Sequence, residues 1–211
     1  MAIVAGSDEA GRGPVIGPLV ICGVSIDEKD IPKLVDIGVK DSKFLTPKKR
    51  EELFPKIKLI IKDYMITIVE PKEVDDAVES DTLNLNWLEA IKTAIIVNYL
   101  KPESAIIDCP STNIQAYTDY MKRFLKQDTK LILKHKAESH PEVAAASILA
   151  KVTRDNQIEE LKKRYGDFGS GYPSDKKTQD YLKQNWKKYP EIFRKSWKSY
   201  QNVATQKKLG E

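Results

Sequence analysis

The amino-acid sequence predicts an α/β protein in which helices flank a mixed five-stranded sheet, with a small helical subdomain at the C-terminal end. Three observations support this fold class. Strand-like apolar runs dominate the first 70 residues, helical and strand patterns alternate over residues 83–165, and basic helical patterns follow. Strands that alternate with helices pair in parallel through right-handed crossovers, so the later strands are expected to extend an antiparallel front.

The first three strands are expected at Ile3–Asp8, Leu19–Ile26 and Leu59–Val69. The second run is almost entirely apolar, which indicates a strand that is buried on both faces. Thr46 and Pro47 have the residue types of an N-cap and a first helical position, so a short helix is expected to begin there. Pro55 is expected to limit this helix, because proline interrupts helical hydrogen bonding.

Helical patterns become prominent after residue 70. A short helix is expected at Pro71–Glu79 and a longer one at Leu83–Leu100. The longer one has apolar residues at the spacing of a single helix face, at Leu85, Leu88, Ile91, Ile95 and Ile96. The next expected elements are a short buried strand, a helix, a fifth strand and a long helix, at Ser104–Asp108, Ile114–Leu125, Lys130–Leu133 and Pro141–Tyr165.

The C-terminal part combines a glycine-rich loop with basic helices. The loop is expected at Gly166–Ser174, and two helices are expected around Lys177–Trp186 and Glu191–Trp197. The chain from Gln201 onward is polar, which is typical of a frayed tail. We therefore predict a main α/β domain over residues 1–165, and a basic helical subdomain with its tail over residues 166–211.

Composition places the chain among globular proteins. The 211 residues are 41% hydrophobic and carry a net charge of +4. No apolar run approaches the roughly 20 residues of a membrane span, and no secretory signal is recognisable, so a cytoplasmic location is expected. Residues 151–211 hold 15 Lys and Arg against eight Asp and Glu, whereas the first 150 residues hold 20 against 23. This asymmetry suits contact with a polyanion, although a solvated helical face rich in lysine would look the same.

Cys22 and Cys109 are the only cysteines, and neither has a partner at zinc-finger spacing. Such sparse use is typical of a reducing compartment. Cys22 is expected to be a small core residue, and a disulfide between the two cysteines stays open.

Acidic residues at expected strand ends are the strongest functional signal. Asp8 and Glu9 end the first strand and precede a turn containing Gly11, Arg12 and Gly13. Adjacent carboxylates repel one another unless a cation lies between them, and a glycine-rich turn lets backbone amides approach an anion. Together these features suit phosphoryl transfer. Acids that are simply solvated at a strand end are the alternative.

Two more acids are expected near the first pair. Asp108 ends the fourth strand, and ligands in open α/β sheets bind beyond the carboxyl ends of strands. If the first and fourth strands are neighbours, Asp8 and Asp108 meet there. Glu138 precedes the long helix and is within reach of the same site. A turn residue before Pro110 and a favourable acid at a helix N-terminus are the respective alternatives.

Five motifs occur in a fixed order along the chain, and together they resemble ribonuclease HII, the type 2 ribonuclease H, in its archaeal form. They cover residues 8–14, residues 41–43, the strand-end Asp108, residues 144–155 and residues 169–175. The last of these, Gly-Ser-Gly-Tyr-Pro-Ser-Asp, is closer to the archaeal branch. The resemblance spans nearly the whole chain and implies an RNase H-like fold with a helical C-terminal extension.

The resemblance also implies an activity. Family members cut the RNA strand of RNA–DNA hybrids and cut at ribonucleotides embedded in duplex DNA, with four carboxylates and divalent metal. Asp8, Glu9 and Asp108 match the first three carboxylates. The fourth position normally holds Asp, and here Glu138 lengthens that side chain by one methylene. Clustered carboxylates favour Mg²⁺ or Mn²⁺ over zinc, and two such ions support phosphodiester hydrolysis that leaves 5′-phosphate and 3′-hydroxyl ends.

Substrate-binding residues follow from the same resemblance. Gly11, Arg12, Gly13 and Tyr172 match the residues that recognise the ribose 2′-hydroxyl, the group that separates RNA from DNA. Ser42 and Lys43 are expected to bind backbone phosphate. A duplex-binding surface is expected from charged residues with Trp186 and Trp197 nearby, namely Lys176, Lys177, Arg194, Lys195 and Lys198. The tryptophans are expected to belong to the core of the subdomain rather than to stack on bases.

Other functions stay open at this point. A related metal-dependent DNA nuclease, such as a junction resolvase, is one alternative, and the Gly-Arg-Gly turn with Tyr172 argues against it. A hybrid-binding protein without catalysis is another, and Glu138 is the one feature that favours it. The expected partners are RNA–DNA hybrids and ribonucleotide-containing duplex DNA, and the expected state is a monomer. Residues 201–211 show no clear hydrophobic-aromatic motif for a replication clamp.

Overall fold

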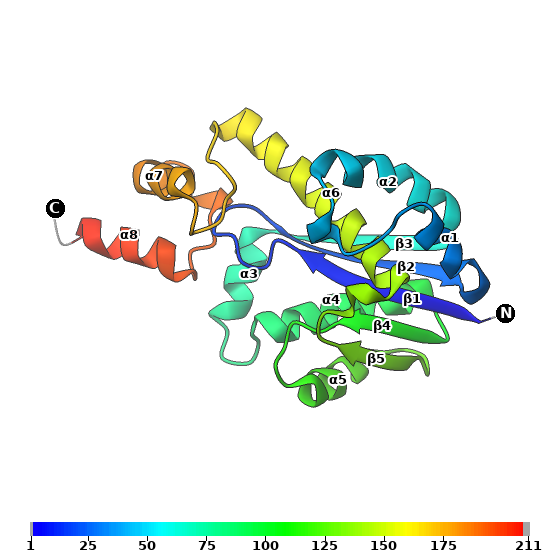
Figure 1. Ribbon diagram of the computed structural model, residues 1–211. Helices are drawn as coiled ribbons and strands as arrows, with labels where there is room; N and C mark the ends of the chain where they lie inside the picture. Colours follow the sequence, from blue (N-terminus) through cyan, green and yellow to red (C-terminus); the bar gives the residue numbers. More distant parts are fainter. Residues whose placement is uncertain (1, 209–211) are drawn as a thin grey trace. The chain divides into compact units, whose positions relative to one another are not determined.

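A computed structural model describes residues 2–208 and contains one five-stranded sheet (Figure 1). Its strands are β1 (Ile3–Ala10), β2 (Leu19–Asp27), β3 (Asp63–Val69), β4 (Ser104–Asp108) and β5 (Lys130–Lys134). The spatial order is β3-β2-β1-β4-β5. β1 pairs with β2 in antiparallel fashion, whereas β4 lies parallel to both β1 and β5. The predicted mixed five-stranded sheet is therefore confirmed.

Eight α-helices accompany the sheet within the described part of the chain. They are α1 (Ile31–Asp36), α2 (Pro47–Ile60), α3 (Pro71–Val78), α4 (Leu85–Leu100), α5 (Ile114–Lys122), α6 (Pro141–Tyr165), α7 (Lys176–Asn185) and α8 (Lys198–Lys208). Four short 3₁₀ turns are η1 (Glu28–Asp30), η2 (Ser42–Phe44), η3 (Ala137–Ser139) and η4 (Pro190–Ile192). The predicted bounds of the long helix before Gly166 are confirmed at both ends.

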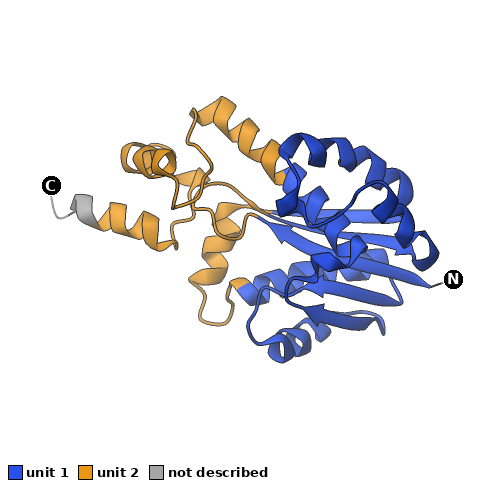
Figure 2. Cartoon of the chain, viewed as in Figure 1, with its two compact units in different colours: residues 1–10, 20–68, 86–153 blue, residues 11–19, 69–85, 154–211 orange. Residues whose placement is uncertain are grey.

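The chain forms two compact units (Figure 2). Unit 1 consists of residues 1–10, 20–68 and 86–153, and unit 2 consists of residues 11–19, 69–85 and 154–211. Unit 2 thus draws two segments from the first half of the sequence. The domain boundary at residue 165 stays a prediction, because a compact unit of the structure need not be a domain that folds independently.

Unit 1 is a layered α/β structure. α1, α2 and the first part of α6 cover one face of the sheet, and α4 and α5 lie on the other (Figure 1). A buried cluster joins alternate residues of β2 to Leu53 and Ile57 of α2 and to Ala144–Ala146 of α6. β2 is buried along nearly its whole length, as its apolar sequence predicts. Burial of this apolar surface is the main force that holds the layers together.

Close packing of β1 against α6 requires Gly6. A Cβ atom added to Gly6 would lie 2.3 Å from the backbone carbon of Glu142. Only glycine permits this approach, because any side chain would collide with helix backbone. The first turn of α6 therefore sits directly on the strand that carries Asp8.

Two predicted bounds near residue 60 are wrong. α2 continues through Pro55 to Ile60, so the strand that was expected from Leu59 begins at Asp63. Thr46 is the predicted N-cap, and its hydroxyl accepts a hydrogen bond from the backbone of Lys49 at 3.2 Å. Pro55 is exposed, so water can reach the carbonyl that its missing N–H leaves without a partner. Burial of Leu53 and Ile57 on either side keeps the helix continuous.

The buried face of α4 also differs from the predicted one. Ile95 is exposed, whereas Ala90, Ala94 and Val97 are buried. The prediction selected large apolar residues, but small residues permit closer contact between helix and sheet. The helix itself extends from Leu85, two residues after the expected start.

The end of the chain is more helical than predicted. The segment expected to be a helix from Glu191 contains only the turn η4, and Phe193 is extended. α8 instead occupies the stretch that was expected to be a frayed tail, and residues 209–211 of that stretch lie outside the described residues. Tyr200, Val203 and Ala204 pack into the core of unit 2. This narrow i, i+3, i+4 stripe is enough to hold a helix that is otherwise polar.

Unit 2 has its own aromatic core. Phe168 and Phe193 are fully buried in it together with Val15 and Ile16. Trp186 and Trp197 pack against this cluster, as predicted for core rather than stacking residues. No helix within residues 2–208 combines the length and the hydropathy that crossing a membrane requires.

Candidate active site

Strand pairing brings the two strand-end aspartates together. β1 lies parallel to β4, with Ser7 opposite Ile107 at the carboxyl ends of both strands. Asp8 and Asp108 are the next residues of the two strands, so they lie side by side at the same edge of the sheet. The first and fourth strands are thus neighbours, which is the condition under which Asp8 and Asp108 were expected to meet.

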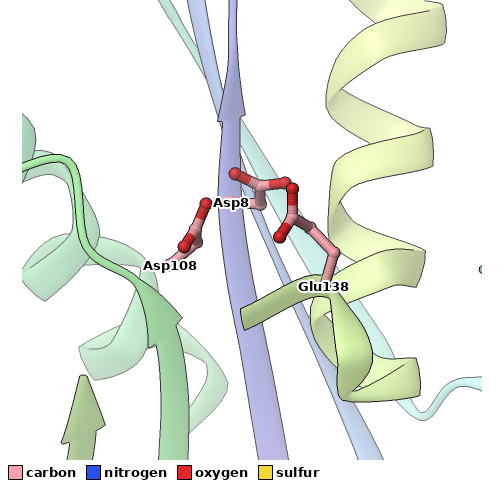
Figure 3. Close-up of side chains that lie close together, drawn as sticks. All are labelled: Asp8, Asp108 and Glu138. Carbon is pink, nitrogen blue, oxygen red and sulfur yellow. The ribbon is translucent and has the colours of Figure 1, made fainter. Parts of the chain in front are cut away.

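Three carboxylates form one cluster at this edge (Figure 3). One oxygen each from Asp8, Asp108 and Glu138 can be chosen so that all three lie within 4.8 Å of one another. Asp8 is only 7% exposed, while the other two side chains are partly exposed. In Figure 3 the three carboxylates converge on one small region. Such an arrangement of oxygen atoms is suited to a hard divalent cation.

The electrostatics of the cluster is unfavourable without a cation. The pKa of Asp8 is raised to about 7, mainly by burial and also by the charges of Asp108 and Glu138, while a hydrogen bond with the Ser147 side chain opposes the increase. Burial also raises the pKa of Asp108, and a hydrogen bond from the backbone of Ala137 opposes that increase. Carboxylates with raised pKa values that face one another store repulsion, which a bound cation relieves.

A tight turn delivers Glu138 to the cluster. Lys136 adopts the left-handed conformation with φ of 55°, and η3 follows it directly. The backbone N–H of Ala137 donates to Oδ1 of Asp108 at 3.0 Å. The turn is thereby tied to β4, and Glu138 is held near the two aspartates in spite of its longer side chain.

Glu9 occupies a different position from the other three acids. It follows Asp8 directly in β1, and successive side chains of a strand point to opposite faces. The pKa of Tyr117 on α5 is raised by burial and then by the charges of Glu89 and Glu9. Glu9 thus lies toward the face that α4 and α5 cover. The structure does not bring it into the group of three.

Ser42 and Lys43 lie beside the cluster. The Ser42 hydroxyl is 2.8 Å from the hydroxyl of Ser147, which itself hydrogen-bonds Asp8. Nζ of Lys43 is 3.5 Å from Oε1 of Glu138. Sequence analysis did not single out Ser147, although a hydroxyl in an otherwise apolar helical run was the available signal.

The Gly-Arg-Gly turn and Tyr172 belong to unit 2 and lie near each other there. A Cβ atom on Gly13 would be 3.5 Å from the ring of Tyr172, which is 38% exposed. Gly11 has φ of 87°, where a side chain would be strained, and it contacts the Arg154 side chain closely. The structure thus places Tyr172 beside the turn with which the prediction grouped it, although about 160 residues separate the two in the chain.

The prediction that Arg194 belongs to a duplex-binding surface is wrong. Its side chain is fully buried, and its guanidinium donates to the carbonyls of Gly11, Arg12 and Gly17 at 2.6, 2.8 and 3.1 Å. A buried guanidinium with several carbonyl partners is a structural clamp rather than a phosphate ligand. The indole of Trp197 adds a hydrogen bond to the carbonyl of Gly13 at 3.0 Å. Arg194 therefore fixes the backbone conformation of the Gly11–Gly13 turn through hydrogen bonds to its carbonyls.

The two cysteines take no part in this chemistry. Cys22 and Cys109 are both buried and carry free thiols, so no disulfide joins them. Burial raises the pKa of both thiols, which keeps them protonated and unreactive.

Comparison with known proteins gives a consistent result. A family model described as Ribonuclease HII matches residues 5–200. The Ribonuclease HII of Pyrococcus horikoshii is 48% identical over 206 residues, which covers 95% of this chain and 92% of that protein. The Ribonuclease HII of Methanococcus maripaludis is 46% identical over 210 residues, which covers 95% and 87%.

Two similar solved structures are members of the same family. The crystal structure of the ribonuclease H2 from Pyrococcus horikoshii has a TM-score of 0.88 and 46% identity, and the match covers 97% of this chain and 98% of that one. The structure of the PCNA:RNase HII complex from Archaeoglobus fulgidus has a TM-score of 0.83 and 39% identity, with 93% and 95% covered. The predicted RNase H-like fold and the resemblance to archaeal relatives are both confirmed.

Proposed function

Because the chain belongs to the ribonuclease HII family of endonucleases, we propose that it hydrolyses the RNA strand of RNA–DNA hybrids and cuts at ribonucleotides embedded in duplex DNA. Cleavage leaves 5′-phosphate and 3′-hydroxyl ends. The observation that carries this proposal is the convergence of Asp8, Asp108 and Glu138 within 4.8 Å at the end of two parallel strands. Family membership supplies the reaction, and the cluster supplies a site for it.

The donor set fits divalent metal. Three carboxylates in close approach, one of them buried with its pKa raised to about 7, are the oxygen-rich and electrostatically strained environment that Mg²⁺ or Mn²⁺ relieves. When bound, such ions activate a water and stabilise charge on phosphate and on the departing oxygen. Asp8, Asp108 and Glu138 would hold them, and Glu9 is the fourth carboxylate that family resemblance assigns to the site.

The residues around the cluster have supporting roles in this proposal. Ser147 orients the Asp8 carboxylate through its hydrogen bond. The ammonium group of Lys43 contacts the Glu138 carboxylate, and it can also bind a phosphate of the substrate. The hydroxyl of Ser42 is hydrogen-bonded to that of Ser147 and therefore lies close to Asp8, where it can contact the substrate.

Recognition of ribose is assigned to unit 2. The turn at Gly11–Gly13 offers backbone groups, and Tyr172 offers an exposed ring beside it. Backbone groups can hydrogen-bond the 2′-hydroxyl, and an aromatic ring packs on a sugar face. A deoxyribose lacks the hydroxyl and leaves these polar groups without a partner, which is how such a site rejects DNA.

Cleavage of a labelled DNA duplex that contains one ribonucleotide tests the proposal. Wild type and Asp8→Asn are compared with Mg²⁺, with Mn²⁺ and with EDTA. We expect metal-dependent cutting on the 5′ side of the ribonucleotide by wild type only, and no cutting of all-DNA duplex. Binding without cutting would instead favour a hybrid-binding protein, and cutting of all-DNA duplex would favour a related DNA nuclease.

Several further properties remain predictions from the sequence. They are the choice between Mg²⁺ and Mn²⁺, a cytoplasmic location, a monomeric state and a domain boundary at residue 165. Metal titration of activity addresses the first, and light scattering of the purified protein addresses the third.

A further inference from the structure

A hollow of about 550 Å³ lies in unit 1 beside the carboxylate cluster. Its walls come from the end of α1, the segment through η2, the turn at η3 and the start of α6. Glu138 belongs both to this hollow and to the carboxylate cluster. The hollow is thus continuous with the proposed active site and is not accounted for by the metal site itself.

An exposed aromatic ring stands at this hollow. Phe44 is 71% exposed and Val35 is 54% exposed, and both line the hollow. Exposed phenylalanine gains nothing for the fold, because its apolar surface stays in water. Nζ of Lys43 lies 5.6 Å from the ring centroid and leaves most of the ring surface open. Phe44 therefore has apolar surface available for a ligand.

Two lysines line the hollow together with the ring. Lys40 and Lys136 are both exposed and both line the hollow. Asp41 and Glu138, the acidic residues of the lining, are each in ion-pair distance of Lys43. No salt bridge to Lys40 or Lys136 forms within the described residues, so these two ammonium groups are available for an anionic ligand.

The segment that carries Phe44 is firmly held. Ser42 contacts Ser147 across the site, and Nη1 of Arg50 donates to the carbonyls of Ser42 and Leu45 at 3.1 and 2.7 Å. The backbone N–H of Lys43 donates to Asp41 at 3.1 Å. A ring on such a fixed segment loses little conformational entropy when a ligand covers it.

We propose that this hollow binds the sugar–phosphate backbone of one substrate strand, with a sugar against Phe44 and the flanking phosphates on Lys40 and Lys136. The inference rests on the proposed function, since it extends the same substrate beyond the cleavage site. Bases of a duplex are stacked and paired, so a sugar face is what a protein ring can reach without distorting the duplex. An apolar ring that lines the same hollow as two ammonium groups suits the alternation of apolar sugar and anionic phosphate.

Salt-dependent binding tests this assignment. The dissociation constant for a ribonucleotide-containing duplex is measured in EDTA at several salt concentrations. Phe44→Ala should raise it about 5-fold at every salt concentration, because a lost apolar contact does not change the salt slope. Lys40→Ala and Lys136→Ala should each reduce the slope of log K against log salt by about 0.9, as loss of one phosphate contact requires.

Matched controls come from α2. Leu59 is 87% exposed and Lys56 is exposed, and neither lines the hollow. Leu59→Ala and Lys56→Ala should leave affinity and slope unchanged. Phe44→Leu should retain most of the affinity if the contact is apolar packing on a sugar.

Unchanged affinity in Phe44→Ala, or unchanged slopes in both lysine variants, would overturn the inference. A loss in Phe44→Leu as large as in Phe44→Ala would also overturn it, because the ring would then be needed for base stacking. Metal-dependent cleavage by wild type is measured on the same duplex. If wild type cuts and the variants bind normally, only this inference fails, whereas a wild type that does not cut contradicts the proposed function.

Discussion

The guanidinium carbon of Arg154 lies 5.5 Å from the ring centroid of Tyr172. Arg154 is almost completely buried, and its Nε and Nη2 atoms have no hydrogen-bond partner among the described residues. Burial lowers the pKa of Arg154. A buried cation with two unsatisfied donors costs free energy, so its contact with the tyrosine ring and the neighbouring turn is expected to serve substrate recognition.

This relationship predicts a separation of stability from activity. Arg154→Met keeps a long side chain and removes the unpaired charge, so the melting temperature should stay the same or increase. Cleavage at a single ribonucleotide should nevertheless fall about 5-fold in kcat/KM, since Tyr172 loses about 1 kcal/mol of cation–π support. A double-mutant cycle with Tyr172→Ala checks the coupling. Independent effects of the two substitutions would contradict the assignment.

The raised pKa of Asp8 predicts a pH dependence of stability in the absence of metal. The pKa is about 7 in the folded protein and 3.8 in the reference state, so the folded state holds more protons between these values. The free energy of unfolding should therefore be highest below about pH 4 for this group and should fall as pH rises toward 7. Thermal unfolding in EDTA at pH 5 and pH 8 measures this difference.

Asp8→Asn serves as the control for that measurement. It cannot ionise, so the contribution of Asp8 to the pH dependence should disappear. In EDTA at pH 8 the variant should melt about 4 °C above wild type, because the repulsion with Asp108 and Glu138 is removed. Equal melting temperatures at pH 8 would show that the cluster stores no repulsion. With Mg²⁺ the advantage of the variant should shrink, since wild type then gains binding energy.

Glu138 is expected to be a metal ligand in spite of its longer arm. Glu138→Gln keeps the shape and removes the charge, so the metal concentration for half-maximal activity should rise about 10-fold or more. Glu138→Asp keeps the charge on the same turn and should retain more activity than Glu138→Gln. Glu51→Gln on α2 is a matched control without effect. Activity measured over a metal titration tests this expectation. Equal curves for wild type and Glu138→Gln would contradict the assignment of Glu138 as a metal ligand.

Gly6 is expected to be essential for the approach of α6 to β1. Gly6→Ala should lower the free energy of unfolding by about 3 kcal/mol, because its Cβ would meet fixed backbone at 2.3 Å. Gly166→Ala is the comparison, since Gly166 has φ of 88° and open space around it. That change should cost about 1 kcal/mol from backbone strain alone. Urea denaturation measures both, and a smaller loss for Gly6→Ala would show that the two elements can move apart.

The sequence was most informative where local pattern and chemistry coincide. Asp8 and Asp108 each end an apolar run, so their place at a sheet edge could be predicted before any pairing was known. Alternating helices and strands indicated parallel pairing, but whether the first and fourth strands are neighbours stayed open until the structure placed β1 beside β4. The helix over Pro141–Tyr165 was predicted in full, since Pro141 suits a first helical position and no further proline or glycine occurs before Gly166.

What could not be predicted depends on contacts between residues far apart in the chain. The burial of Arg194 depends on carbonyls of a turn near the N-terminus, and nothing in its neighbourhood distinguishes it from surface lysines and arginines. The helix α8 depends on an aromatic core that the stripe at Tyr200, Val203 and Ala204 completes. The direction of Glu9 depends on strand geometry at the end of β1, which residue types alone do not define.

The clamp formed by Arg194 has a consequence for synthesis of the protein. Its guanidinium supports carbonyls that precede it in the chain by 177 to 183 residues. A nascent chain on the ribosome therefore contains all three carboxylates before it can complete the turn at residues 11–13, which requires Arg194. The proposed recognition of ribose thus depends on synthesis of the chain as far as Arg194, and a prematurely terminated product that lacks this arginine would carry the acidic residues without a shaped turn.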